Sequence, residues 1–193
     1  MKKIGLFGGA FNPPHLGHLI LAETICEAAG LDEIWWLPAP HPPHKDTVGM
    51  TDSAHRWQMV QCAIADNERF VASDVEFHRE GKSYTVETLR HVQTQFPDDT
   101  FFLLIGGDSL RDFHKWYAFT EIIERVSLLV FPRPHVDLSA VSPDILAHTT
   151  FVDAPLIALS STHIRTRLMD RKSVRYCVPE SVLAYIDTHQ LYR

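Results

Sequence analysis

The chain has 193 residues, of which 45% are hydrophobic, 22% charged and 10% aromatic, the proportions of a globular protein. This length predicts one domain spanning residues 1–193, with enough buried surface to fold without disulfide or metal support. The 18 lysines and arginines against 24 acidic residues leave a net charge of −6, which argues against a surface that binds nucleic acid. An anionic ligand would therefore need positive charge concentrated in one site.

The cysteines and the N-terminal segment indicate where the protein resides. Cys26, Cys62 and Cys177 form no C-x-x-C pair, and their odd number argues against a disulfide framework, so we expect a reducing compartment. The N-terminal apolar run stops at Gly8, and no stretch of about 18 apolar residues follows, so we expect neither a signal peptide nor membrane contact. These features predict a cytoplasmic protein.

Strand and helix patterns alternate along the chain. Short apolar runs predict strands over residues 3–7, 33–37, 100–105 and 127–131, a strand pair within 70–77 and an extended segment over 151–159. Apolar residues at helical spacing predict helices over 15–29, 53–65, 85–96, 120–125, 160–170 and 179–189, the last with Pro179 in its first turn. The proline-rich segment 38–50 cannot hold regular structure and is a candidate functional loop.

The alternation predicts an α/β fold, namely a Rossmann-like, doubly wound parallel sheet with helices on both faces and a small C-terminal helical portion. In such sheets, ligands bind beyond the carboxyl ends of the strands. Gly8-Gly9, Gly106-Gly107 and the turn at Ser160 all fall at predicted strand ends. We therefore expect these three segments to contribute to one site.

The segment GGAFNPPHLGH, residues 8–18, is the strongest functional motif. Its glycines let the backbone approach a ligand closely, and the following helix presents free N–H groups and the positive end of its dipole. His15 and His18 are three residues apart, so both face one side of the first helical turn. The combination predicts an anion site rather than a plain strand-to-helix turn. No third ligand at metal spacing accompanies the histidines, so we assign no metal site.

This segment resembles the H-x-G-H signature of the nucleotidylyltransferase superfamily, whose adenylyltransferases carry a pattern like G-G-[ST]-F-[DN]-P-x-H-x-G-H. Ala10 stands where a small hydroxyl residue is usual, and Asn12 stands where aspartate is common. Both departures leave the backbone and the two histidines available. The signature alone leaves open pantetheine-phosphate adenylyltransferases, cytidylyltransferases and class I aminoacyl-tRNA synthetases.

Four further segments carry groups suited to a nucleotide. Lys45, on the proline-rich loop, can hold a phosphate or can simply be solvated. Thr85 opens a predicted helix, either as a hydroxyl donor to a ligand or as an ordinary N-cap. Asp108 follows a strand end and can accept from ribose hydroxyls, while Trp116 can stack on a heterocycle or pack in the core. The segment 159–165, LSSTHIR, is either a second phosphate cradle or a capped surface helix.

Together these segments resemble the bacterial nicotinate-nucleotide adenylyltransferases over nearly the whole chain. The matching motifs are G-G-x-F-x-P-x-H-x-G-H, P-H-K, S-Y-T-x-x-T-L, G-x-D with a downstream tryptophan, and S-S-T-x-I-R. Pantetheine-phosphate enzymes usually have threonine in place of His15, the R-T-x-G-I-S-T-type segment of cytidylyltransferases is absent, and a synthetase needs more than 193 residues. The resemblance implies transfer of AMP from ATP to nicotinate mononucleotide, giving nicotinate adenine dinucleotide and pyrophosphate in NAD biosynthesis.

The resemblance also implies a set of site residues. The catalytic residues would be His15, His18, Lys45 and Arg165. The residues in contact with ATP would be Gly8, Gly9, Ala10, Phe11, His15, His18, Gly106, Asp108, Ser161, Thr162, Ile164 and Arg165. Those in contact with the acceptor would be Lys45, Ser83, Thr85, Asp108, Trp116, Tyr117 and Arg133. Mg²⁺ would enter with ATP, and analogy with the family suggests a homodimer or a larger assembly.

Other functions stay open at the level of the sequence. The same scaffold could adenylylate nicotinamide mononucleotide or phosphopantetheine instead, or bind nucleotides as a sensor without turnover. A histidine-rich metal-binding protein is a further alternative, prompted by His41, His44 and His55, although these lack a sustained ligand spacing.

Overall fold

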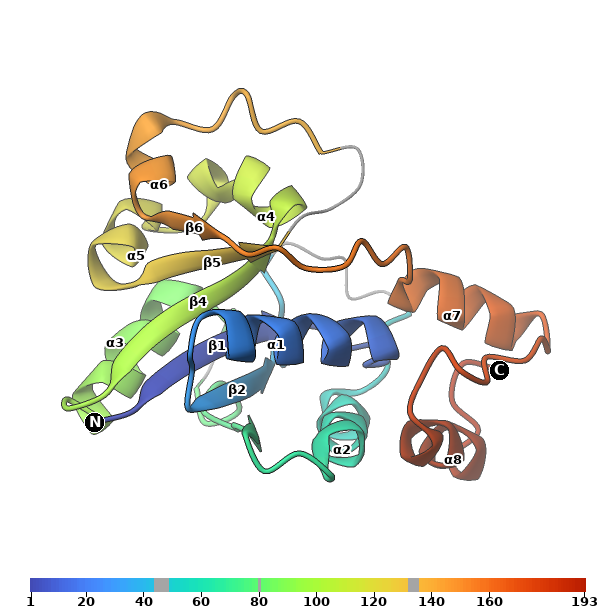
Figure 1. The fold of residues 1–193 in the computed structure, drawn as a ribbon. Helices are drawn as coiled ribbons and strands as arrows, with labels where there is room; N and C mark the ends of the chain where they lie inside the picture. Colours follow the sequence, from blue (N-terminus) through green and yellow to red (C-terminus); the bar gives the residue numbers. More distant parts are fainter. Residues whose placement is uncertain (44–48, 80, 132–135) are drawn as a thin grey trace.

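The computed structural model describes residues 1–43, 49–79, 81–131 and 136–193 (Figure 1). Within these ranges six strands form a single sheet in the order β3-β2-β1-β4-β5-β6, and every neighbouring pair is parallel. The strands are β1 (Lys3–Gly9), β2 (Glu33–Pro38), β3 (Phe70–Ala72), β4 (Thr100–Gly106), β5 (Ser127–Phe131) and β6 (Thr149–Phe151). The predicted doubly wound parallel sheet is therefore confirmed.

Helices cover both faces of this sheet (Figure 1). They are α1 (Leu16–Ala28), α2 (Ser53–Ile64), α3 (Thr85–Gln95), α4 (Gly107–Arg111), the 3-10 helix η1 (Phe113–Lys115), α5 (Phe119–Arg125), α6 (Pro143–Ala147), α7 (Ser161–Met169) and α8 (Glu180–Thr188). One core packs α1, α2, α7 and α8 against the sheet, and the other packs α3 to α6 against the opposite face. Because successive side chains of a strand point to opposite faces, Leu103 enters one core and Leu104 the other.

Two of the predicted extended segments are wrong. The strand pair expected within residues 70–77 is only the short strand β3, since the chain turns after Ala72 and buries the adjacent residues Val75 and Glu76 together. The extended segment expected over 151–159 is instead β6, which ends at Phe151, and residues 152–160 have no regular structure. Pro155 lacks an N–H group and cannot continue the ladder.

Helix boundaries agree with the sequence pattern to within about a residue, with informative exceptions. Pro179 is the N-cap of α8 rather than part of its first turn. Thr85 opens α3 as predicted, but the N-cap is Tyr84, which makes no side-chain capping bond. The pattern missed α4, η1 and α6, which have 5, 3 and 5 residues, because such lengths are too short to establish a helical period.

The strand order determines where a ligand can bind. Chain connections run outward in opposite directions from β1 and β4, which lie side by side in the centre of the sheet. At such a reversal the loops that follow the two strands separate and leave a crevice at their carboxyl ends. Helix α7 and the C-terminus lie beyond the same end of β1, opposite the N-terminus (Figure 1). Across the described ranges, every helix is too short or too polar to cross a membrane.

Candidate active site

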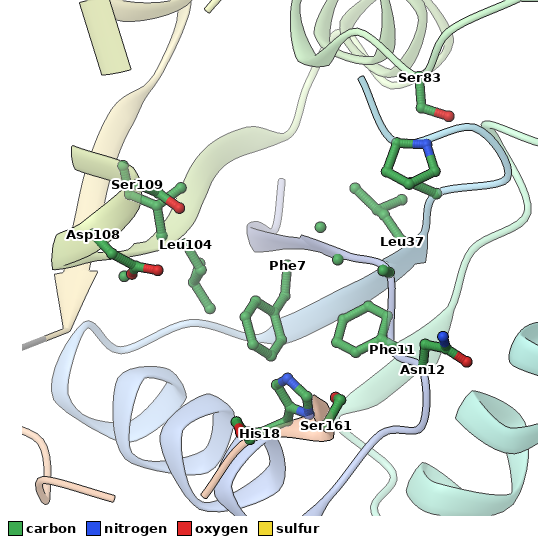
Figure 2. A pocket seen from close by; sticks show the side chains of 18 of the residues that line it. Phe7, Phe11, Asn12, His18, Leu37, Ser83, Leu104, Asp108, Ser109 and Ser161 are labelled. Atoms are coloured by element: carbon green, nitrogen blue, oxygen red, sulfur yellow. The ribbon is translucent and has the colours of Figure 1, made fainter. Parts of the chain in front are cut away.

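A pocket of about 870 Å³ opens at the carboxyl ends of β1 and β4. This volume suits a cofactor-sized ligand. Its wall includes most of the predicted site residues: Gly8, Gly9, Ala10, Phe11, His15, His18, Ser83, Thr85, Gly106, Asp108, Trp116, Ser161, Thr162 and Arg165. Residues from both ends of the predicted set, Gly8 and Arg165 among them, thus line one cavity. Figure 2 shows Asp108 and Ser83 on opposite sides of it, with His18 and Ser161 along a third side.

The two signature histidines cap the first helix reciprocally. His15 is the N-cap of α1, its Nδ1 accepts from the backbone N–H of His18 at 3.3 Å, and Nδ1 of His18 accepts from the N–H of His15 at 3.2 Å. The rings stack with centroids 3.6 Å apart and planes 18° apart. Because each Nδ1 accepts a hydrogen bond, the neutral rings carry their proton on Nε2. The neutral pair therefore carries Nε2–H groups, a kind of donor that suits phosphate oxygens.

Gly17, between these histidines, is closely packed. A Cβ atom at Gly17 would lie 3.1 Å from Nδ1 of His15 and 3.2 Å from a side-chain carbon of Ile157. Any larger residue would press on the ring of His15, which is 3% exposed. The glycine of the signature thus lets the His15 ring lie flat against the start of α1.

The turn before α1 is held by its carbonyl groups. The N–H of Ala39 donates to the carbonyl of Gly9 at 2.9 Å, and Nη1 of Arg56 donates to the carbonyl of Ala10 at 2.8 Å. In a planar trans peptide the C=O of one residue and the N–H of the next point in opposite directions. The N–H groups of Ala10 and Phe11 therefore point away from these partners. The arrangement gives the turn backbone donors of the kind that bind phosphate.

The start of α7 contributes a second set of donors. Oγ of Ser160 accepts from the N–H of His163 at 3.2 Å and caps the helix, as the sequence predicted. The hydroxyl of Ser161 donates to the carbonyl of Pro13 at 2.8 Å, and Nη1 of Arg165 donates to the carbonyl of Asn12 at 2.9 Å. The helix start is thereby tied to the signature turn, so that both positive helix ends, α1 and α7, border one pocket.

The opposite wall offers hydroxyl groups and an aromatic ring. Ser83 is buried, Thr85 begins α3, and Trp116 is partly exposed with its ring 5.1 Å from that of Phe113. Glu76 also lines the pocket; it is 8% exposed, and its Oε1 accepts from the Thr88 hydroxyl at 2.7 Å. Burial raises the pKa of Glu76 above its ordinary value, although hydrogen bonds from Thr88 and Ser83 oppose that shift. This wall suits a flat ring with polar substituents.

The remaining predicted residues are not part of the described wall. Lys45 and Arg133 lie outside the described residues. Ile164 is fully buried in the core beneath α7, so its side chain does not line the pocket. Tyr117 is 56% exposed, packs its ring 4.8 Å from that of Tyr84, and is absent from the pocket wall. The contacts predicted for these four residues stay predictions, and those of Ile164 and Tyr117 would have to use backbone groups.

Comparison with known proteins places this site in a family. A family model described as cytidylyltransferase-like matches residues 6–167. A protein of Salinibacter ruber named "Probable nicotinate-nucleotide adenylyltransferase" is 45% identical over 190 residues, covering 98% of this chain and 97% of its own. The nicotinate-nucleotide adenylyltransferase of Bacillus subtilis is 40% identical over 192 residues, covering 100% and 99%. The chain belongs to the nicotinate-nucleotide adenylyltransferase family.

A solved structure agrees with this family fold. The Plasmodium falciparum nicotinic acid mononucleotide adenylyltransferase, complexed with NaAD, superimposes with a TM-score of 0.83 at 21% identity, covering 100% of this chain and 98% of that one. At this identity the match supports the architecture alone. The Rossmann-like sheet predicted from the sequence is therefore the fold of the family.

This member of the adenylyltransferase family also has site residues that the motifs did not single out. Arg56 is 1% exposed and donates to the carbonyls of Ala10 and Ala39, each at 2.8 Å. It shares the buried face of α2 with Met59 and Val60, so an arginine at a core position of the helical pattern was a usable signal. Glu76 gave no comparable signal, because the segment around it has no regular period.

Proposed function

We propose that this protein transfers AMP from ATP to nicotinate mononucleotide, forming nicotinate adenine dinucleotide and pyrophosphate in NAD biosynthesis. The observation that carries this proposal is that one pocket combines a polyanion side with a ring side. Two helix starts and the stacked histidines lie on the first, and Ser83, Thr85 and Trp116 lie on the second. Membership in the nicotinate-nucleotide adenylyltransferase family selects this reaction among those the pocket could accommodate.

The reaction requires positioning more than proton transfer. A phosphate oxygen of nicotinate mononucleotide attacks the α-phosphorus of ATP in line, the bond from that phosphorus to the bridging oxygen breaks, and pyrophosphate leaves with the bonding electrons. The nucleophile is already ionised near neutral pH, so neither a general base nor a covalent intermediate is needed. Catalysis then depends on aligning two polyanions and neutralising the charge that develops during transfer.

The ATP phosphates would lie between the signature turn and α7. We assign His15 and His18 to the phosphates, with His18 in contact with the transition state, because both residues line the pocket and their capping bonds leave the ring proton on Nε2. Ser161, Thr162 and Arg165 would hold the β- and γ-phosphates at the start of α7. Lys45 is assigned with them to offset repulsion between the substrates, and Asp108 would accept from a ribose hydroxyl.

Magnesium would arrive with ATP. Across the described residues no three His, Cys, Asp or Glu side chains gather as a metal site, and the groups that face the polyanion side are mainly N–H and hydroxyl donors. These groups fit phosphate oxygens rather than a cation. We therefore propose that the phosphate oxygens of ATP hold the Mg²⁺, which neutralises charge on the leaving pyrophosphate when bound.

The acceptor ring would lie against Trp116, with Thr85 and the backbone of Tyr117 near its carboxylate. Arg133 and Ser83 are assigned to the same substrate. Donors that converge on a carboxylate would face the NH₂ group of the amide analogue, and each buried donor left unpaired costs about 1–3 kcal/mol. We therefore expect nicotinate mononucleotide to be preferred over the nicotinamide form by tens-fold or more.

The proposal is tested by following pyrophosphate release from Mg²⁺-ATP with three acceptors in parallel. Turnover with nicotinate mononucleotide, and little with nicotinamide mononucleotide or phosphopantetheine, is the expected result. Equal rates with nicotinamide mononucleotide would support the adenylyl transfer but contradict the contacts assigned to the nicotinate carboxylate. ATP binding without turnover on any acceptor would contradict the proposal and favour a nucleotide sensor.

Cytoplasmic location and a homodimer complete the proposal. The cysteines Cys26, Cys62 and Cys177 are free, which suits a reducing compartment. The homodimer suggested by analogy with the family stays a prediction. Sedimentation of the purified protein at several concentrations measures it directly.

A further inference from the structure

The turn that carries the backbone donors is strained. Phe11 has a φ of +45°, in the left-handed region that residues with a side chain rarely adopt. A conformation of this kind costs on the order of 1 kcal/mol or more and persists only where surrounding contacts determine it. Arg56 holds the carbonyl of Ala10 on one side of Phe11, and Arg165 holds the carbonyl of Asn12 on the other. The second anchor depends on where Asn12 lies, and the side chain of Asn12 is held by a separate bond.

That side chain is bound by the far end of the chain. The hydroxyl of Tyr192 donates to Oδ1 of Asn12 at 2.7 Å and lies 3.9 Å from the sulfur of Met59. Asn12 is itself 5% exposed, so this bond is largely shielded from water. Burial raises the pKa of Tyr192 to about 12, which keeps the phenol protonated and able to donate at any physiological pH.

We propose that Tyr192 is a positioning residue of the adenylyl transfer: by fixing Asn12 it holds the strained turn so that the donors of Ala10 and Phe11 and the guanidinium of Arg165 meet the phosphates in register. Tyr192 is absent from the pocket wall and touches no substrate in this scheme. The expected effect of Tyr192 on kcat rests on the proposed function. That Tyr192 fixes the turn follows from the contacts alone.

A second tyrosine near the C-terminus supplies a matched control. The hydroxyl of Tyr185, on α8, lies 2.9 Å from Nδ1 of His55, on α2, and so also joins the C-terminal segment to an earlier part of the fold. It makes this contact away from the signature turn and does not line the pocket. Tyr185→Phe and Tyr192→Phe each remove one hydroxyl group that ties the C-terminal segment down, but only the second loses a bond to Asn12.

The experiment compares both variants by amide hydrogen exchange and by kinetics. Tyr192→Phe should speed exchange in peptides that cover residues 8–14 of the ligand-free protein, whereas Tyr185→Phe should leave these peptides as in the wild type. In the assay with Mg²⁺-ATP and nicotinate mononucleotide, Tyr192→Phe should lower kcat by about tenfold to about 100-fold, with both KM values within about twofold. Tyr185→Phe should keep kcat near the wild-type value at a similar Tm.

A double-variant cycle isolates the bond. In the Asn12→Ala background, adding Tyr192→Phe should change kcat by less than about twofold, because its partner is already gone. Equal exchange of residues 8–14 in both tyrosine variants would overturn the positioning role, whatever the activity. Equal kcat values with faster exchange would overturn its importance for catalysis. A wild-type protein without turnover would count against the proposed function, while the exchange result would still decide whether Tyr192 fixes the turn.

Discussion

At the scale of single residues, the site depends on side chains that serve the backbone and the ligand together. His15 and His18 cap α1 through Nδ1 and are assigned to the phosphates through Nε2. One ring nitrogen therefore fixes the orientation with which the other meets the substrate. The sequence predicted that the rings share a face, but the reciprocal cap depends on rotamers that residue spacing cannot specify.

His18→Ala should lower kcat by about 100-fold or more if its ring stabilises the transition state, and steady-state pyrophosphate release measures the loss. The variant also removes a cap, so a control is needed. His18→Asn keeps a short side-chain acceptor for the N–H of His15 but lacks the Nε2 donor. The Asn variant should therefore be stable yet equally slow. Near-normal turnover of either variant would contradict a role for His18 in stabilising the transition state.

Trp116→Ala should raise the KM for the acceptor with little change in the KM for ATP, since the indole lies on the ring side of the pocket. Trp116 also stacks near Phe113, so thermal unfolding has to be recorded beside the kinetics. A large drop in Tm with an unchanged acceptor KM would mean that the tryptophan serves the core instead.

The buried carboxyl of Glu76 makes stability depend on pH. Its folded-state pKa is raised, so the folded protein holds this proton more tightly than the unfolded chain does. The resulting stabilisation is complete below the ordinary value of 4.5 and is lost as pH rises through the raised pKa. Glu76→Gln should therefore gain stability relative to the wild type as pH increases. Urea midpoints from about pH 4 to about pH 8 measure this trend, and the exposed control Glu124→Gln should run parallel to the wild type.

At the scale of elements, strand β1 changes role along its length. Near its start, a Cβ atom at Gly5 would come within 2.8 Å of side-chain carbons of both Leu31 and Leu104. At its carboxyl end, a Cβ at Gly8 would meet nothing within 4 Å, and Gly8 lines the pocket. The first glycine is needed for packing between the sheet and its neighbours, and the second leaves room for the ligand.

These two glycines should respond oppositely to alanine. Gly5→Ala should lower the free energy of unfolding by about 1–3 kcal/mol through overpacking, with near-normal activity of the folded fraction. Gly8→Ala should retain the stability of the wild type but raise the KM for ATP. Denaturant titration and steady-state kinetics on both variants separate the effects, and a stability loss in Gly8→Ala as large as in Gly5→Ala would contradict the assignment.

At the scale of the whole molecule, two hydrophobic cores share one sheet. Phe7 and Leu6 are neighbours on β1 yet belong to different cores, so neither layer of helices can detach without exposing the strands. The single domain predicted from the length leads to one cooperative transition. Tryptophan fluorescence and far-ultraviolet circular dichroism should give coincident thermal midpoints. Two separated transitions would indicate that α7 and α8 unfold as an independent unit.

The sequence was sufficient to predict structure where its pattern is local and repeated. The strand at residues 100–106 and the first helix follow from uninterrupted apolar runs and 3.6-residue spacing, and the position of the site follows from the glycines at strand ends. The sequence was insufficient where contacts between remote parts of the chain determine the local structure. The short β3, the inward turn of Glu76 and the contact between Tyr192 and Asn12 depend on partners that are remote in the chain or outside any period.

The bond between Asn12 and Tyr192 also has a consequence for the order of folding. The two residues are 180 positions apart, and the N–H of Leu16 likewise donates to the remote carbonyl of Cys177. Closing such long loops costs conformational entropy, so these contacts form late, after the intervening chain has become ordered. The sheet can therefore be formed before the signature turn is anchored, and a chain at that stage would be folded yet a poor catalyst.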